Sequence, residues 1–222
     1  MAAPTPQSFS LTTIEREGKD RMKASILVTV GSTRFDALVN VVLHPAFLTA
    51  LQVQEEEDEV DIHIQYGTSH INYSQLNLIP TSHPLSYQYS PSITLHLFPY
   101  TPSLTTLIQQ ATIVISHAGS GTILEVLRAK SSPPLIVVPN HTLMDDHQSE
   151  LARALGKDGY LLVGRVPDAG VGLEEHALAL GRQVHRLLSS IKAQEKTIIK
   201  PFPTWSPLNF AQLVDDRLGF NV

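Results

Sequence analysis

The chain has 222 residues, of which 42% are hydrophobic and 17% are charged, and its formal net charge is −5 at pH 7. This length suits one domain, or one domain with tails, and the apolar content is sufficient for a core. The negative charge, without any run rich in lysine and arginine, argues against a dedicated nucleic-acid binder. The absence of cysteine excludes disulfides, thiolate metal sites and a cysteine nucleophile, and it fits a reducing compartment.

The sequence shows no sign of membrane insertion. Its apolar runs stay well below the roughly 18–20 residues that a membrane-spanning helix needs. Residues 1–22 are polar, with carboxylates at Glu15, Glu17 and Asp20. They lack the apolar centre of a signal peptide, so we interpret them as a flexible arm. We therefore expect a cytoplasmic chain that works at a membrane only where another protein holds it there.

Apolar periodicity divides the rest of the chain into alternating strands and helices. The predicted strands are 24–30, 60–66, 93–98, 112–115, 134–138 and 160–163. The predicted helices are 35–51 with a kink at Pro45, 104–108, 123–129, 145–155 and 173–188. Between the second and third strands, residues 68–91 are rich in Ser, Tyr, Asn and Pro without clear periodicity. We interpret this segment as a surface insertion loop.

The order of these elements predicts an α/β fold, a Rossmann-like parallel sheet with helices on both faces. The near-continuous apolar strands agree, since strands of such a sheet are buried on both sides. We place this domain at residues 23–190, with the insertion inside it. Residues 191–222 combine prolines with an amphipathic stretch at 208–218, which we interpret as a linker and a docking helix. The alternative is a helix packed on its own domain.

One segment, from Ile113 to Glu125, carries the main chemical signal. A β-branched strand runs into the turn His117-Ala118-Gly119-Ser120-Gly121-Thr122, and a helix that contains Glu125 follows. Free backbone N–H groups at such a helix start, together with the helix dipole, suit a phosphate. At this spacing Glu125 is able to accept hydrogen bonds from a ribose of the same ligand. A neutral His117 can donate one N–H to a phosphate oxygen.

Each of these features also has a plain structural explanation. Short glycine turns between a strand and a helix are common, and this one lacks the full Rossmann glycine spacing and the P-loop lysine. Glu125 suits the helix dipole even without a ligand, and His117 can equally be a packed histidine at a strand end. The turn Gly31-Ser32-Thr33 is either a second phosphate-facing turn or an ordinary connection. Both turns directly follow strands, so both lie at the carboxyl edge of the sheet, where ligands bind in such folds.

A second polar cluster, Asp145-Asp146-His147-Gln148, follows the next strand. Asp and His are metal-ligand types, but adjacent residues on a helix do not share a face, so we predict no metal site. His147 and Gln148 suit contacts with sugar hydroxyls at the other end of the ligand. The alternative is that Asp145 or Asp146 is only an N-cap. Taken together, the two clusters predict a nucleotide-sugar site.

These motifs resemble the carboxyl-terminal, nucleotide-sugar-binding half of the GT-B glycosyltransferases. Residues 117–125 are similar to the donor-binding signature of that family. The residues that the resemblance places at the diphosphate are Gly31, Ser32, Thr33, His117, Gly119, Ser120, Gly121 and Thr122. It places Glu125 at the ribose, and the residues that it places at the donor sugar are Asn140, His147 and Gln148. The family more often has Asp or Glu where this chain has His147, and His117 is the single candidate for a catalytic role.

A closer resemblance is to the family of small cytosolic subunits of dolichol-pathway N-acetylglucosaminyltransferases and to related bacterial peptidoglycan lipid-intermediate transferases. It rests on landmarks in the same order, at Val28–Asp36, Gln65–Gly67, Val137–Asn140 and Leu143–Ala152. The resemblance implies inverting transfer of N-acetylglucosamine from UDP to dolichyl-diphosphate N-acetylglucosamine, with neither a metal nor a cofactor. The chain departs from the family at Asp146, where asparagine is more usual, and in its long insertion.

The same resemblance implies a partner. A GT-B enzyme needs two facing domains, so a separate membrane-anchored subunit is expected to bind the acceptor and to supply any general base. The complex would work at the cytosolic face of the endoplasmic reticulum. Two rivals stay open: a non-enzymatic regulatory subunit that binds UDP-sugars, and a dinucleotide-dependent oxidoreductase. The broken glycine spacing, and the lack of an acidic residue after the next strand, argue against the oxidoreductase.

Overall fold

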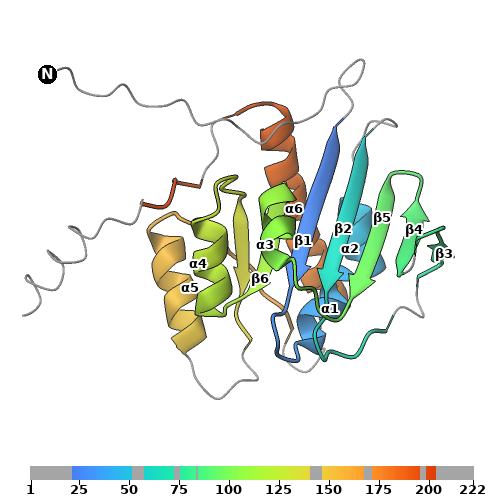
Figure 1. The fold of residues 1–222 in the computed structure, drawn as a ribbon, viewed down its shortest axis with the longest axis horizontal. Helices are drawn as coiled ribbons and strands as arrows, with labels where there is room; N and C mark the ends of the chain where they lie inside the picture. The colour runs from blue at the N-terminus through green and yellow to red at the C-terminus, as the bar shows by residue number, and fades with distance from the viewer. Residues whose placement is uncertain are drawn as a thin grey trace, which may run out of the picture.

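A computed structural model describes residues 22–51, 58–72, 76–83, 85–140, 147–167, 172–195 and 199–203, with the backbone alone at 147 and 148. These residues form an eight-stranded sheet in the order β3-β4-β5-β2-β1-β6-β7-β8 (Figure 1). The strands are β1 (Lys23–Thr29), β2 (Glu59–Gln65), β3 (Ile79–Pro80), β4 (Ser86–Ser90), β5 (Ile93–Phe98), β6 (Ile113–His117), β7 (Leu135–Val138) and β8 (Leu162–Val163). From β5 to β8 all neighbours pair in parallel, whereas β3 and β4 pair antiparallel at one edge.

Helices cover both faces of this sheet, as expected for a Rossmann-like α/β domain. They are α1 (Asp36–Val42), α2 (Pro45–Ala50), α3 (Leu104–Gln110), α4 (Ser120–Leu127), α5 (His147–Lys157) and α6 (Leu173–Lys192). One face packs on α1, α2 and α6 around a large apolar cluster that includes Ile26 and Ile62. The other face packs on α3, α4 and α5 around Leu27 and Val114. Among the helices of the described residues, none has the length and apolar character needed to cross a bilayer.

The segment 68–91 differs from the surface loop that its composition predicts. Ser86–Ser90 forms β4 against β5, and Ile79–Pro80 adds β3 outside it. Tyr87 and Tyr89 pack against the large apolar cluster. Strand β4 is thus partly buried along its whole length, and through β3 and β4 the segment extends the sheet.

Pro45 ends one helix and begins another, where we predicted a single kinked helix over 35–51. The first helix, α1, stops at Val42, and α2 starts with Pro45 at its first position. The His44 side chain caps α2 through Nδ1, which accepts the N–H of Ala46 at 3.1 Å. Proline suits the first position of a helix, where a backbone N–H would have no partner within the helix. Inside a helix its ring would clash with the carbonyl of the preceding turn.

A buried carboxylate ties the two ends of the domain together. The Asp58 side chain is fully buried, accepts the backbone N–H of Met22 at 2.8 Å, and pairs with Lys192 Nζ at 2.8 Å. Met22, the last residue of the predicted arm, is itself buried and therefore belongs to the domain. Residues 1–21 and most of the predicted linker and docking helix, residues 204–222, lie outside the described part of the chain. The domain boundaries at 23–190 therefore stay a prediction.

Candidate functional site

The structure brings the two glycine turns together at one edge of the sheet. They follow β1 and β6, which are parallel neighbours with Thr29 opposite Ser116. The imidazole of His117 lies between the turns and is only 7% exposed. A Cβ on Gly31 would lie 2.6 Å from its Cε1, and one on Gly119 would lie 2.3 Å from its Nε2. A side chain at either position would therefore displace the ring from where it lies.

The backbone conformation at position 31 also favours glycine. Its φ of +67° is in the left-handed region that residues with a Cβ rarely adopt. This conformation turns the chain sharply after β1 and leaves Ser32 exposed at the edge of the sheet. Thr33 does not face outward in the same way, because its hydroxyl donates to the carbonyl of Val30 at 3.0 Å. Thr33 closes the turn, so its predicted contact with a diphosphate stays a prediction.

His117 is held in its neutral form. Burial lowers the pKa of its imidazole, and a weaker opposing effect comes from the backbone of Thr29. A neutral imidazole carries one N–H and one acceptor nitrogen, so it can serve one acceptor as a donor without bringing a full charge. This state agrees with a role beside a ligand and equally with a packed histidine.

Helix α4 starts at Ser120, three residues earlier than predicted. Gly119 is its N-cap residue, and the first helical hydrogen bond runs from the N–H of Ile123 to the carbonyl of Gly119 at 3.0 Å. The N–H groups of the first turn thus have no partner within the helix. Ser120 and Gly121 are exposed, and a Cβ on Gly121 would meet nothing within 4 Å. This open helix start beside His117 has the form of an anion site.

Gln65 is a buried amide that the sequence did not single out as a site residue. Its Oε1 accepts from Thr29 Oγ1 at 2.6 Å and from the N–H of Gly31 at 3.0 Å. Its Nε2 donates to the carbonyls of Gly31 at 2.8 Å and of Pro99 at 2.7 Å. One side chain at the end of β2 therefore fastens the turn after β1 to the loop after β5.

A cavity of about 180 Å³ opens beside this amide. Its lining residues are Gly31, Ser32, Gln65, Tyr100, Thr101 and Leu104. Tyr100 at its mouth is 55% exposed, so its ring is accessible to a ligand. Sequence reasoning missed Tyr100 and Thr101, because nothing in the loop after β5 shows which strand end it will lie beside.

Glu125 lies in α4 and reaches toward α3. Its Oε1 accepts a hydrogen bond from Thr105 Oγ1 at 2.6 Å, between side chains that are not buried. Helix α3 begins at Leu104, which lines the cavity. The contact therefore joins Glu125, the residue predicted to bind the ribose, to the helix that forms part of the cavity wall.

The donor-sugar residues are described less fully. Asn140, after β7, is 3% exposed, and its Nδ2 donates to the carbonyl of Arg34 at 3.3 Å. His147 and Gln148 begin α5, but their side chains lie outside the described residues, as do Asp145 and Asp146. Within the described ranges, no group of three or more His, Asp or Glu side chains is arranged to hold a metal ion.

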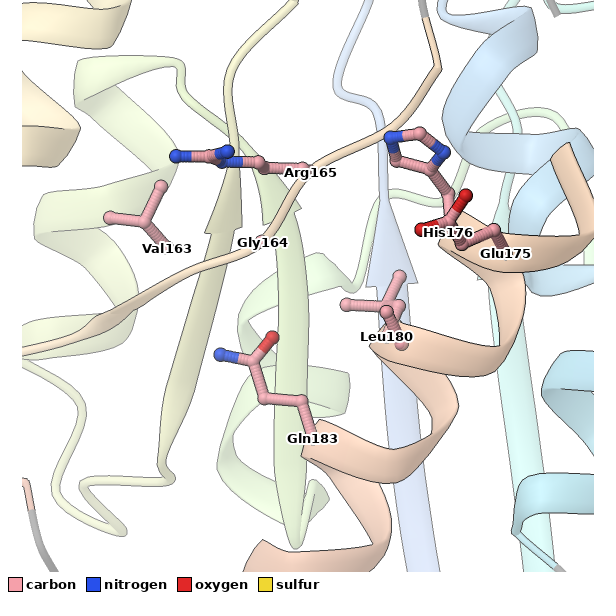
Figure 2. A pocket seen from close by; sticks show the side chains of 8 residues that line it. Val163, Gly164, Arg165, Glu175, His176, Leu180 and Gln183 are labelled. Atoms are coloured by element: carbon pink, nitrogen blue, oxygen red, sulfur yellow. The ribbon is translucent and has the colours of Figure 1, made fainter. Parts of the chain in front are cut away.

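A larger cavity of about 270 Å³ lies apart from these turns, between the end of β8 and α6 (Figure 2). Its lining residues are Val163, Gly164, Arg165, Glu175, His176, Ala179, Leu180 and Gln183. None of the residues predicted from the sequence lines it. The larger cavity is therefore separate from the candidate site at the two glycine turns.

The domain matches a known family over most of its length. Residues 25–201 match the glycosyltransferase family 28 C-terminal domain. The chain belongs to this family. The expected relationship to GT-B glycosyltransferases is thereby confirmed, and the dinucleotide-dependent oxidoreductase is set aside. The candidate site described above therefore lies within a glycosyltransferase family 28 C-terminal domain.

Similar proteins agree with this family. A protein of Cryptococcus neoformans named UDP-N-acetylglucosamine transferase subunit ALG13 is 36% identical over 213 residues, covering 89% of this chain and 98% of that protein. The human protein of the same name is 37% identical over 136 residues, which is 61% of this chain and 10% of the human one. MurG of Acinetobacter baumannii has the same fold, with a TM-score of 0.53 and 20% identity over 88% of this chain and 49% of MurG.

Proposed function

We propose that this chain is the donor-binding subunit of a UDP-N-acetylglucosamine transferase that extends dolichyl-diphosphate N-acetylglucosamine, an early step of protein N-glycosylation. The observation that carries the proposal is the meeting of two glycine turns around a neutral, buried His117. The names of the relatives supply the donor, since the Cryptococcus protein is a UDP-N-acetylglucosamine transferase subunit along nearly its whole length.

In this proposal the diphosphate lies over the two turns. The exposed start of α4 offers backbone N–H groups and the Ser120 hydroxyl, and the turn after β1 offers Ser32. His117 donates one N–H from between them. Neutral donors of this kind bind a diphosphate without a metal, because the helix start already carries partial positive charge.

The nucleoside end of the donor lies toward the smaller cavity. Tyr100 at its mouth is placed to stack on a planar base, and Leu104 adds an apolar wall. Glu125 is near the start of α3 and binds the ribose hydroxyls through its carboxylate. The donor sugar then extends the other way, toward Asn140 and the start of α5, where His147 and Gln148 stand in the sequence.

The reaction is a direct displacement at the anomeric carbon. The acceptor hydroxyl forms the new C–O bond, the bond from the sugar to UDP breaks, and the configuration inverts. The electron pair leaves with UDP, so negative charge grows on the diphosphate, where the fixed donors of this chain stabilise it. Removal of one such donor typically lowers kcat by about 10²–10³. The proton of the acceptor hydroxyl goes to a base on the partner subunit.

The partner is a membrane-anchored chain that binds the lipid acceptor, and it recruits this chain to the cytosolic face of the endoplasmic reticulum. The word subunit in the names of the relatives supports a heteromeric enzyme. The absence of a membrane-spanning helix among the described residues is compatible with recruitment by another protein.

The test is reconstitution. The full chain is co-purified with its partner, and transfer from radiolabelled UDP-N-acetylglucosamine to a dolichyl-diphosphate acceptor is measured for wild type, for Gly119→Trp and for Glu125→Ala. We expect transfer by the wild type and little or none by either variant. Lys130→Ala, an exposed change outside the site, is the control that keeps activity.

Two results would contradict the proposal. Donor binding without turnover beside a functional partner would favour the regulatory subunit that binds UDP-sugars. Wild-type turnover by a folded Glu125→Ala complex would remove the ribose assignment. Titration of the chain with UDP and with NAD checks the nucleotide class independently, and we expect binding of UDP alone.

A further inference from the structure

Thr105 makes a side-chain hydrogen bond to a different helix, although it is exposed on the surface of its own. It lies in the first turn of α3, its side chain is exposed, and its Oγ1 donates to Glu125 Oε1 at 2.6 Å across 20 residues of sequence. Within the described residues this is the one hydrogen bond of the Glu125 carboxylate. A hydrogen bond between exposed side chains contributes little to folding, since water serves both groups equally well in the unfolded chain.

The contact does, however, restrict a flexible side chain. Glutamate is among the side chains that lose most rotamer freedom when they are immobilised. Thr105 removes part of that freedom before any ligand arrives. A carboxylate has about four acceptor positions, and the threonine hydroxyl uses one of them. The remaining positions, including both on Oε2, stay available to a diol.

We propose that Thr105 is a positioning residue that holds Glu125 ready for the ribose of the donor. This inference rests on the proposed function, because it assumes that Glu125 binds a ribose. Thr105 itself does not contact the donor. Its effect is to reduce the ordering cost of binding, which for one rotamer-rich side chain corresponds to about two- to tenfold in affinity.

The test uses variants that differ in one hydroxyl. Thr105→Val keeps the shape and removes the donor, whereas Thr105→Ser keeps the donor. We expect UDP to bind Thr105→Val about two- to tenfold more weakly and Thr105→Ser like the wild type, as measured by calorimetry on the full chain. All three proteins should unfold at the same temperature, because the site is exposed.

A second ligand separates positioning from any general effect on the site. Uridine diphosphate that lacks the 2′ and 3′ hydroxyls has no diol for Glu125 to bind. Thr105→Val and wild type should therefore bind this analogue equally. In a Glu125→Ala background, Thr105→Val should have no further effect on UDP binding, since the group that it positions is gone.

The outcomes distinguish this inference from the proposed function. Wild type that binds UDP no better than the analogue would overturn the ribose role of Glu125, and with it the proposed donor site. Wild type that prefers UDP, together with an equal preference in Thr105→Val, would leave the donor site standing and overturn the role of Thr105. Weaker binding of both ligands by Thr105→Val would also overturn it.

Discussion

Replacement of Gln65 by methionine should destabilise the domain more than any surface change, because one side chain makes four hydrogen bonds at the edge of the sheet. Methionine has similar length but offers no strong donor or acceptor. A typical intramolecular hydrogen bond contributes about 1 kcal/mol net, so four of them amount to about 4 kcal/mol. The carbonyls of Gly31 and Pro99 would each lose a hydrogen-bond donor in a partly buried place. Water cannot fully replace these bonds there, so we expect most of these roughly 4 kcal/mol to be lost from the free energy of unfolding.

Urea unfolding of the full chain measures this loss as a lower midpoint at unchanged slope. The matched control is Gln109→Met, the same chemical change at an exposed position of α3, which should shift the free energy of unfolding by less than about 0.5 kcal/mol. UDP binding to folded Gln65→Met should also weaken, because the turn after β1 and the loop after β5 are no longer fastened together. A loss below about 1 kcal/mol, or one equal to that of Gln109→Met, would refute this reasoning.

Gly119→Ala should lower UDP affinity at least about tenfold, because its Cβ would lie 2.3 Å from His117 Nε2; a single misplaced donor has effects of that order or larger. In Gly121→Ala the added Cβ would meet nothing within 4 Å, so this variant should unfold at the same temperature as the wild type. If Gly119→Ala and Gly121→Ala had equal unfolding temperatures and equal affinities for UDP, the steric argument would be wrong. Asp58→Ala should cost about 1–3 kcal/mol in thermal or urea unfolding, since it removes the acceptor of a buried backbone N–H at Met22. A loss within error of zero would show this carboxylate to be dispensable. Burial lowers the pKa of His117 in the folded state below its ordinary value of 6.5. Below that pH the unfolded chain binds a proton at this histidine more readily than the folded chain, so the free energy of unfolding falls as the pH falls. Melting temperatures between pH 7.5 and pH 5 should therefore drop less for His117→Gln than for wild type, and an equal or larger drop would contradict the assignment.

The parallel core of the fold follows from local pattern. The third predicted strand matches β5 (Ile93–Phe98), because its buried and half-buried residues alternate without interruption. Strand β4 was missed for the opposite reason, since Ser86–Ser90 holds two tyrosines between serines and a glutamine, and only pairing with β5 makes it a strand. Its structure depends on a neighbour that local periodicity cannot show. Pro45 was misjudged because kinking and ending a helix both follow from a missing N–H.

The candidate site divides in the same way. Glycines such as Gly31 and Gly119 mark sharp turns at strand ends, and the position of a strand end in a parallel sheet places its turn at the ligand edge. The partners that fix those turns come from other elements. Gln65 reaches the loop after β5, and Thr105 reaches Glu125 on another helix, so neither contact has a signal in nearby sequence. The sequence therefore predicts which turns lie at the ligand edge of the sheet. The side-chain contacts that fix those turns and Glu125 become visible only in the tertiary structure.

The size of the cavity predicts that this chain alone binds its donor weakly. Ligand sites usually have volumes of about 300–1,000 Å³, whereas the cavity beside Gln65 has about 180 Å³ and an exposed Tyr100 at its mouth. A nucleotide-sugar laid across the two glycine turns would leave much of its surface in water unless another surface covers it, and we expect the partner subunit to supply that surface. We expect UDP-N-acetylglucosamine to bind the reconstituted complex at least about tenfold more tightly than the isolated chain, which corresponds to about 1.4 kcal/mol. Equal affinity, measured by calorimetry for both, would mean that this chain forms the whole donor site by itself.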